Sequence, residues 1–173
     1  MVAVYKPGGE KVIAGLEATF SAGRMPVVAD FLGKDGSPAE WDVTMLSGPI
    51  PNMAGFPLHH RKRFGQSSQG EMWVRRRPVK PSVTTLLEGC NLMLRHWQWG
   101  NFFASSDLGC DGRPVMVLNY DVLANGLVTR KIRDHLRVTS WSDDVMIGMF
   151  HVEWRKRLRF LFLQVQLRVV EDY

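Results

Sequence analysis

The residues of this chain that could move a proton lie in its last third. His151 and Glu153 are two positions apart, so on a β-strand their side chains would share one face and could interact. Asp134 and Tyr120 are two further candidates for an acid or a base. A buried histidine beside a carboxylate can shuttle protons, whereas on a solvated face the same two residues form an ion pair of small energy. The pattern favours the solvated pair.

The sequence has no motif that is typical of a metal site, a phosphate-binding loop or a serine nucleophile. His59 and His60 are adjacent and would point to opposite faces of a strand, and the other histidines lack the spacing of zinc ligands. Gly8-Gly9 is not a glycine-rich loop that precedes a helix. No Gly-x-Ser-x-Gly elbow occurs. We therefore predict no metal and no cofactor.

Length and composition are those of one globular domain. The chain has 173 residues, of which 45% are hydrophobic and 23% charged. No apolar run has the length of a membrane span, and the N-terminus lacks the pattern of a secretory signal, so a cytoplasmic location is expected. Two cysteines, Cys90 and Cys110, are too few for a disulfide framework and are predicted to be free and buried. A homodimer is left open.

The net charge of +5 is unevenly distributed along the chain. Residues 1–58 carry a net −2, and residues 59–173 carry +7. This positive charge could attract nucleic acid or an acidic protein, above all at the basic run 75–80, which follows Trp73. The aromatic residues do not alternate with the basic ones, so a solvated outer face of a β-structure explains the charge better. Nucleic-acid binding is therefore the third of our hypotheses.

The apolar periodicity predicts a short helical start followed by many strands. Residues 10–22 have helical spacing with Gly23 as a C-terminal cap, and residues 26–32 suit a short second helix. Strand patterns follow at 41–46, 61–64, 72–76, 91–95, 97–105, 115–122, 135–141, 145–154 and 158–170. Short turns make these strands antiparallel neighbours, and the long last strand favours closure. The expected fold is mainly β: an antiparallel up-and-down barrel over residues 41–173, with residues 1–35 as a helical cover that packs on the last strand.

Strand alternation also predicts which side chains face the interior. In residues 145–154 one face is wholly apolar and should point inward, which leaves His151 and Glu153 outside. The opposite phase would place both in the cavity and favour catalysis. Trp97, Trp99 and Phe103 share a face if their strand runs unbroken through Gly100, either as a core plug or as an aromatic wall for a ligand. The predicted lining comprises Trp97, Trp99, Phe103, Met116, Leu118, Tyr120, Met146, Phe150 and Trp154.

Five short motifs lie between residues 97 and 150. They are Trp97-Gln98-Trp99-Gly100-Asn101-Phe102-Phe103, Val117-Leu118-Asn119-Tyr120-Asp121, Asn125-Gly126, Ile132-Arg133-Asp134-His135-Leu136-Arg137 and Ile147-Gly148. Together they resemble a pattern in small uncharacterised bacterial proteins with lipocalin-like (calycin) barrels. His135 stands where that pattern has an acid. The resemblance implies a barrel with a cavity, which in such proteins often holds one small apolar ligand, and some such barrels act as cyclases or isomerases. Fold alone does not fix the function.

Three functions follow as hypotheses, in order of preference. The first is a cytoplasmic barrel that binds a small, largely apolar ligand, since nine methionines and eighteen aromatic residues suit an adaptable apolar interior. The second is a cofactor-free isomerase or cyclase that uses the same cavity, with His151, Glu153, Tyr120 or Asp134 as its acid or base. The third is the basic module for nucleic acid or an acidic protein.

Overall fold

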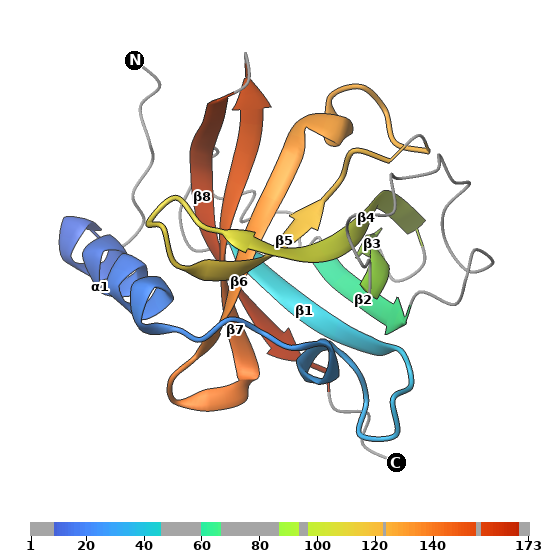
Figure 1. Cartoon of the computed structure of the whole chain (residues 1–173), viewed down its shortest axis with the longest axis horizontal. Helices are drawn as coiled ribbons and strands as arrows, with labels where there is room; N and C mark the ends of the chain where they lie inside the picture. The colour runs from blue at the N-terminus through green and yellow to red at the C-terminus, as the bar shows by residue number, and fades with distance from the viewer. Residues whose placement is uncertain are drawn as a thin grey trace.

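The chain folds into a closed barrel of eight strands, in which each strand pairs with the next and the last also pairs with the first (Figure 1). The computed structural model describes residues 9–45, 60–66, 87–93, 97–122, 124–154 and 157–169. All eight neighbouring pairs are antiparallel. The prediction of a mainly β, up-and-down barrel with an N-terminal helical segment is confirmed.

The strands follow one another with short connections over the second half of the chain. A 3-10 turn, η2 (Thr129–Lys131), precedes the sixth strand. The predicted strand 72–76 and the basic run 75–80 lie outside the described residues. The strands are β1 (Ala39–Met45), β2 (His60–Gln66), β3 (Leu87–Met93), β4 (Trp97–Leu108), β5 (Pro114–Asn119), β6 (Ile132–Thr139), β7 (Ser142–Trp154) and β8 (Arg157–Arg168).

One helix, α1 (Gly9–Ala22), packs on the outside of the barrel. Its buried Phe20 forms an apolar cluster with Val115, Val117 and Ile147, which point outward from β5 and β7. The sequence predicted that this helix covers the last strand, and that prediction is wrong, because the helix lies mainly against β6 and β7. The outward-facing valines and isoleucine offer an apolar patch there that matches the buried face of the helix. None of the described helices has the length and apolar character to cross a membrane.

A single 3-10 turn, η1 (Val28–Phe31), closes one end of the barrel in place of the short helix predicted at 26–32. Its Phe31 and the following Leu32 are buried in the barrel core. The Phe31 ring lies 4.7 Å from the ring of Phe64, which points inward from β2. The end from which η1 enters is therefore filled by apolar side chains.

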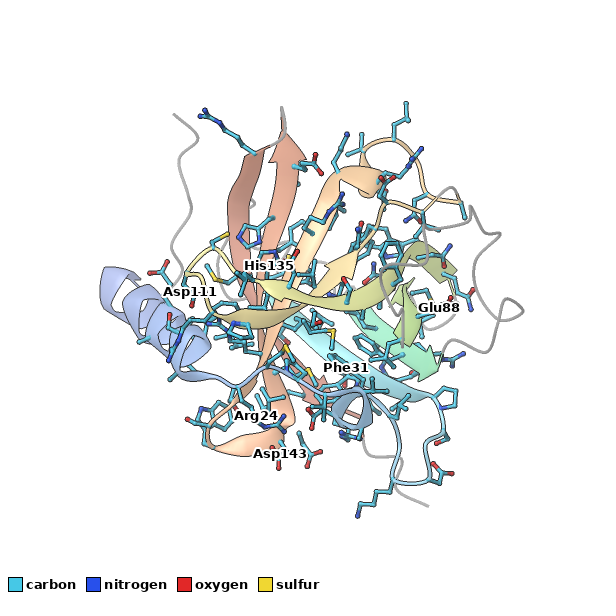
Figure 2. The ribbon with its side chains drawn as sticks, in the orientation of Figure 1. Arg24, Phe31, Glu88, Asp111, His135 and Asp143 are labelled. Atoms are coloured by element: carbon cyan, nitrogen blue, oxygen red, sulfur yellow. The ribbon has the colours of Figure 1, made fainter. Side chains whose placement is uncertain are left out.

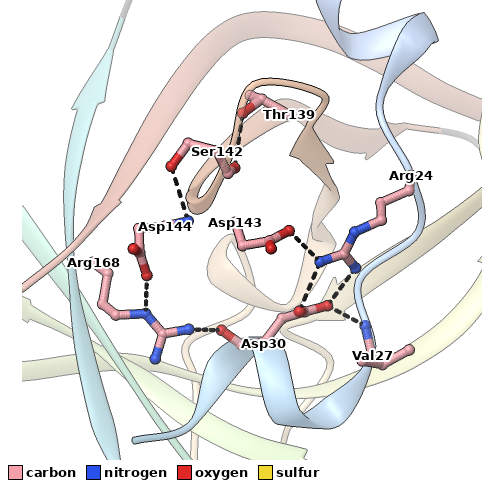
Figure 3. Close-up of polar contacts among 8 residues, drawn as sticks. All are labelled: Arg24, Val27, Asp30, Thr139, Ser142, Asp143, Asp144 and Arg168. Carbon is pink, nitrogen blue, oxygen red and sulfur yellow. Dashed lines mark hydrogen bonds and ion pairs between the residues drawn. The ribbon is translucent and has the colours of Figure 1, made fainter. Parts of the chain in front are cut away.

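Two arginines hold η1 against the barrel (Figure 3). Arg24 donates two hydrogen bonds to the Asp30 carboxylate, at 2.7 and 2.8 Å, and one to Asp143 at the start of β7 at 2.8 Å. Arg168, near the end of β8, donates to the Asp30 carbonyl oxygen at 2.6 Å and pairs with Asp144 at 2.8 Å. The closing turn is thus tied both to the start of β7 and to the last strand.

In β5, β6 and β7, the described inward-facing residues are those that strand alternation predicts. Met146 is buried in the barrel core, and Phe150 packs against it from the same strand. This confirms the predicted phase of β7, so His151 lies on the outer face. The side chains of Trp97 and Trp154 lie outside the described part of the structure. The other core residues of this half include Met116, Leu118, Tyr120, Leu136 and Val138.

Candidate functional site

Four polar side chains lie together inside this apolar barrel. Lys62, Asn91, Tyr120 and Asp134 each expose at most 1% of their surface. Lys62 on β2 is the cross-strand partner of Asn91 on β3, so the two side chains are neighbours on the inner face. Burying a polar group costs free energy unless the group is paired. A buried polar cluster inside an apolar core is therefore a candidate functional site.

The strongest interaction in this group is the ion pair between Lys62 and Asp134. The Lys62 ammonium donates a hydrogen bond to Oδ2 of Asp134. Since β2 and β6 are four strands apart in a barrel of eight, the pair spans the interior from one wall to the other. Burial lowers the pKa of Lys62, and the Asp134 carboxylate opposes that shift. Asp134 is among the residues predicted from the sequence, whereas Lys62 is not, although strand alternation places Lys62 and Phe64 on one face of β2.

Tyr120 and Asn91 form the second polar contact of the interior. The Asn91 amide donates to the Tyr120 hydroxyl at 3.3 Å and to the Gly100 carbonyl oxygen at 3.2 Å. Burial, and then the nearby charge of Asp134, raise the pKa of the Tyr120 phenol well above its ordinary value. Tyr120 is therefore neutral at physiological pH and can donate a proton in a hydrogen bond.

A break in β4 decides which of its aromatic residues face inward. The β3–β4 pairing shifts register between Gly89 and Asn91, and Gly100 has a φ of 60°, so the strand does not run unbroken through Gly100. As a result Phe102 is buried in the core, whereas Phe103 pairs with Asn119 on the opposite face. The condition under which Phe103 would share a face with Trp99 is therefore not met, and Phe103 does not belong to the predicted lining.

A row of aromatic rings runs from the closed end of the barrel to the polar group. The Phe64 ring lies 5.3 Å from the Phe102 ring, which lies 5.2 Å from the Tyr120 ring. Phe31 extends the row at the end of η1. Tilted ring pairs at these distances are favourable and give the interior a wall with flat apolar faces.

Exposure of the inner face differs between the two ends of the barrel. At the η1 end, Trp41, Val138 and Met146 are fully buried. Toward the other end, where β7 ends, the inward-facing Trp99, Phe150 and Val152 are half-buried. Within the described part of the chain, the inward-facing side chains are therefore less buried at the end opposite η1 than at the η1 end.

The remaining candidates lie on the outer face of the barrel. Glu153 forms an ion pair with Arg133 at 3.0 Å. His151 lies instead against His135, with 4.5 Å between ring centroids, and its Nε2 is 3.5 Å from Sγ of Cys110. The predicted proton-transfer residues thus belong to separate places: Tyr120 and Asp134 inside the barrel, and the histidine and glutamate outside.

The two histidines were scattered in the sequence, and the structure brings them together. β6 and β7 are paired, and both side chains point outward from neighbouring strands. Burial, and then the neighbouring His135 ring, lower the pKa of His151 to about 4. Burial likewise lowers the pKa of His135. Both imidazoles are therefore neutral at physiological pH. Of the two thiols, Cys90 is buried as predicted, whereas Cys110 is exposed; both are free.

Comparison of the chain with protein-family models, with curated proteins and with solved structures found no significant match. The arrangement of the residues described above is therefore what bears on function.

Proposed function

We propose that the barrel binds a small, largely apolar molecule in its interior, with one polar group of that molecule at the Lys62–Asp134 pair. The observation that carries this proposal is the ion pair itself, which bridges an interior of aromatic and aliphatic side chains. Replacing a buried ion pair by apolar residues of similar size commonly stabilises a protein by about 1–4 kcal/mol. With apolar residues in place of Lys62 and Asp134, the barrel would be more stable. The presence of the ion pair therefore favours a role in recognising a ligand.

The chemistry of the interior suggests the character of the ligand. The rings of Phe64, Phe102 and Tyr120 present flat apolar surfaces, which suit an aromatic or unsaturated body. An acidic group on the ligand would compete with Asp134 for the Lys62 ammonium. The hydroxyl of Tyr120 and the amide of Asn91 can hydrogen-bond to the same polar group.

The ligand would enter at the end of the barrel opposite η1, where the inward-facing side chains are half-buried. Phe150 and Val152 face inward and remain partly exposed at the end opposite η1. A ligand that enters there would meet apolar surface first and the charged pair second.

Two matched fluorescent probes test the proposal. 8-Anilinonaphthalene-1-sulfonate carries an acidic group, and N-phenyl-1-naphthylamine has the same ring system without it. We expect both to bind the folded protein saturably at one site. In the double variant Lys62→Met with Asp134→Leu, the affinity for the sulfonate should fall at least about tenfold, since a charge-assisted hydrogen bond is lost. The affinity for the neutral probe should change little.

A substitution at the rim supplies the control for the place of binding. Val152→Trp puts a large side chain on the inner face at the accessible end, whereas Leu108→Trp adds the same group to an exposed position at the other end. We expect Val152→Trp to lower the affinity for both probes and Leu108→Trp to leave both affinities unchanged. Absence of saturable binding by the folded protein, or equal effects of the two tryptophan variants, would overturn the proposal.

Proton-transfer catalysis on the bound molecule is a second candidate function. The observation that favours it is the meeting of a carboxylate, an ammonium and a phenol in one desolvated place. Asp134 would accept a proton from the substrate, and Lys62 or Tyr120 would return one, which is a cofactor-free isomerisation. Asp134→Asn keeps the shape of the site and removes the base. Native mass spectrometry would identify a small molecule that co-purifies with the protein. If the protein is a catalyst, Asp134→Asn should bind that molecule but not convert it.

A further inference from the structure

The outer face of the barrel holds a second group of residues, independent of the interior. Cys110 comes from the β4–β5 turn, His135 from β6 and His151 from β7, and one ligand atom of each lies within 4.8 Å of the others. Figure 2 shows His135, with Asp111 from the same turn as the cysteine, on the side of the barrel where α1 lies. A thiol and two imidazoles are the donor set that borderline transition metals prefer.

The separation between two of these atoms fits a tetrahedral ion. With a Zn–S bond of about 2.3 Å and a Zn–N bond of about 2.05 Å, a tetrahedral angle separates sulfur and nitrogen by about 3.6 Å. The distance between Sγ of Cys110 and Nε2 of His151 is 3.5 Å. The two atoms therefore stand at the separation that a shared zinc ion would impose.

The state of His135 is a second observation that points to a ligand. Its side chain is 3% exposed, and within the described residues its Nδ1 is buried without a hydrogen-bond partner. A buried polar atom without a partner is destabilising, and a metal ion bound by this imidazole would fix its tautomer and help to explain its burial.

The turn that carries Cys110 is held rigidly beside the histidines. Asp111 accepts two hydrogen bonds from Arg137, at 2.7 and 2.8 Å, and Arg137 also donates to the Arg113 and Pro114 carbonyl oxygens at 3.1 Å. Arg137 lies two residues beyond His135 on the same strand. This clamp fixes the thiol before any ligand arrives, which lowers the entropic cost of binding.

We propose that Cys110, His135 and His151 bind a zinc ion, with the fourth position open to water. The Cys110 thiol releases its proton to solvent as the Zn–S bond forms, and no electron is transferred. Because Cys110 is exposed, solvent reaches the ion at this position. Three protein ligands and one open position are the arrangement of zinc sites that activate water.

Cobalt(II) is the probe for this site, used with protein that carries no histidine tag. We expect one equivalent to bind with the visible bands of tetrahedral coordination and a thiolate-to-cobalt charge-transfer band, and zinc to displace it. Cys110→Ala should abolish the charge-transfer band and lower zinc affinity at least about 100-fold. Cys90→Ala is the matched control, since it removes the other free thiol, and it should leave both unchanged.

Thermal unfolding gives an independent readout. Zinc should raise the unfolding midpoint of the parent protein and of Cys90→Ala, but not that of Cys110→Ala. Cys110 is exposed, so the Cys110→Ala change should leave the fold intact. The test therefore does not depend on substituting either of the buried histidines. An octahedral cobalt spectrum without charge transfer, or equal zinc affinity in Cys110→Ala, overturns the proposal. The interior probes serve as the check that the barrel itself is unaffected.

Discussion

Lys62 and Asp134 face one another across the barrel, and their ion pair joins two walls that are four strands apart. Neither strand neighbours the other, so the contact exists only once the barrel has closed. The pair therefore acts as a cross-link between the two halves of the meander, in addition to its proposed role in ligand recognition.

Removing one partner of this pair should destabilise the barrel more than removing both. Lys62→Met leaves the Asp134 carboxylate buried without its cation, and we expect a loss of about 3–5 kcal/mol in the free energy of unfolding. Asp134→Leu should cost a similar amount. The double variant should lie within about 1 kcal/mol of the parent protein or be more stable. Urea unfolding gives the free energy of unfolding of the parent protein and the three variants. If the losses of the two single variants added up in the double variant, the prediction would be wrong.

The closing turn η1 should loosen in acid because of Asp30. Burial would raise the pKa of this carboxyl, but hydrogen bonds from Arg24 and from the Val27 amide hold it below its ordinary value. The folded protein thus releases this proton more readily than the unfolded chain. The resulting stability is present above about pH 4 and is lost as the pH falls through the lower folded pKa.

The matched variants Asp30→Asn and Asp143→Asn test this prediction. At neutral pH the first should lower the free energy of unfolding by about 1–2 kcal/mol, because the Asp30 carboxylate accepts three hydrogen bonds. The second removes an 80% exposed partner of Arg24 and should change it by less than about 0.5 kcal/mol. Urea midpoints from about pH 6 to about pH 3 should fall less steeply for Asp30→Asn than for the parent.

Tyr120 should resist ionisation far into the alkaline range. Its phenol is fully buried, and both burial and the Asp134 charge raise its pKa well above the ordinary value. In a titration of tyrosinate absorbance, the parent protein and Tyr120→Phe should therefore give the same curve up to about pH 11. An additional step should appear in the parent only when alkali unfolds the barrel. A difference between the two curves near pH 10 would show that the phenol is accessible.

Much of the fold could be predicted from sequence periodicity. The alternation in residues 145–154 assigned Met146 and Phe150 to the interior because one face there is wholly apolar, and the structure agrees. The face of Phe103 could not be predicted, because the register depends on a kink at Gly100 that only the pairing with β3 reveals. Local spacing does not encode such a shift, since it arises between strands.

The polar sites were harder to predict than the core, for a physical reason. Lys62 stands between Arg61 and Arg63, and a run of three basic residues normally indicates a solvated strand edge. Its partner is 72 residues away. Cys110 and the two histidines are likewise joined only by the turn and the strand pairing. Partners that are distant in sequence become visible only when closure of the barrel places them together. The basic run 75–80 lies outside the described residues, so nucleic-acid binding stays a prediction.

Gly100 should be required for the polar interior, because its backbone and its surroundings both exclude a side chain. It has a φ of 60°, and a Cβ there would stand 2.7 Å from the Asn91 amide nitrogen and 3.3 Å from the Tyr120 ring. Gly36 has a φ of 80° with nothing within 4 Å of the same position, so it shares the backbone strain without the crowding. The two glycines form a matched pair.

Gly36→Ala should cost about 1 kcal/mol for the left-handed backbone alone. Gly100→Ala should cost about 2–4 kcal/mol, because the crowding of Asn91 and Tyr120 is added to the same strain. Chemical unfolding measures the difference between the two. Under the proposed function, Gly100→Ala should also weaken the sulfonate probe, since Asn91 and Tyr120 must move. Equal losses of stability in the two variants would mean that Asn91 and Tyr120 can move to accommodate a side chain at position 100 without a measurable cost.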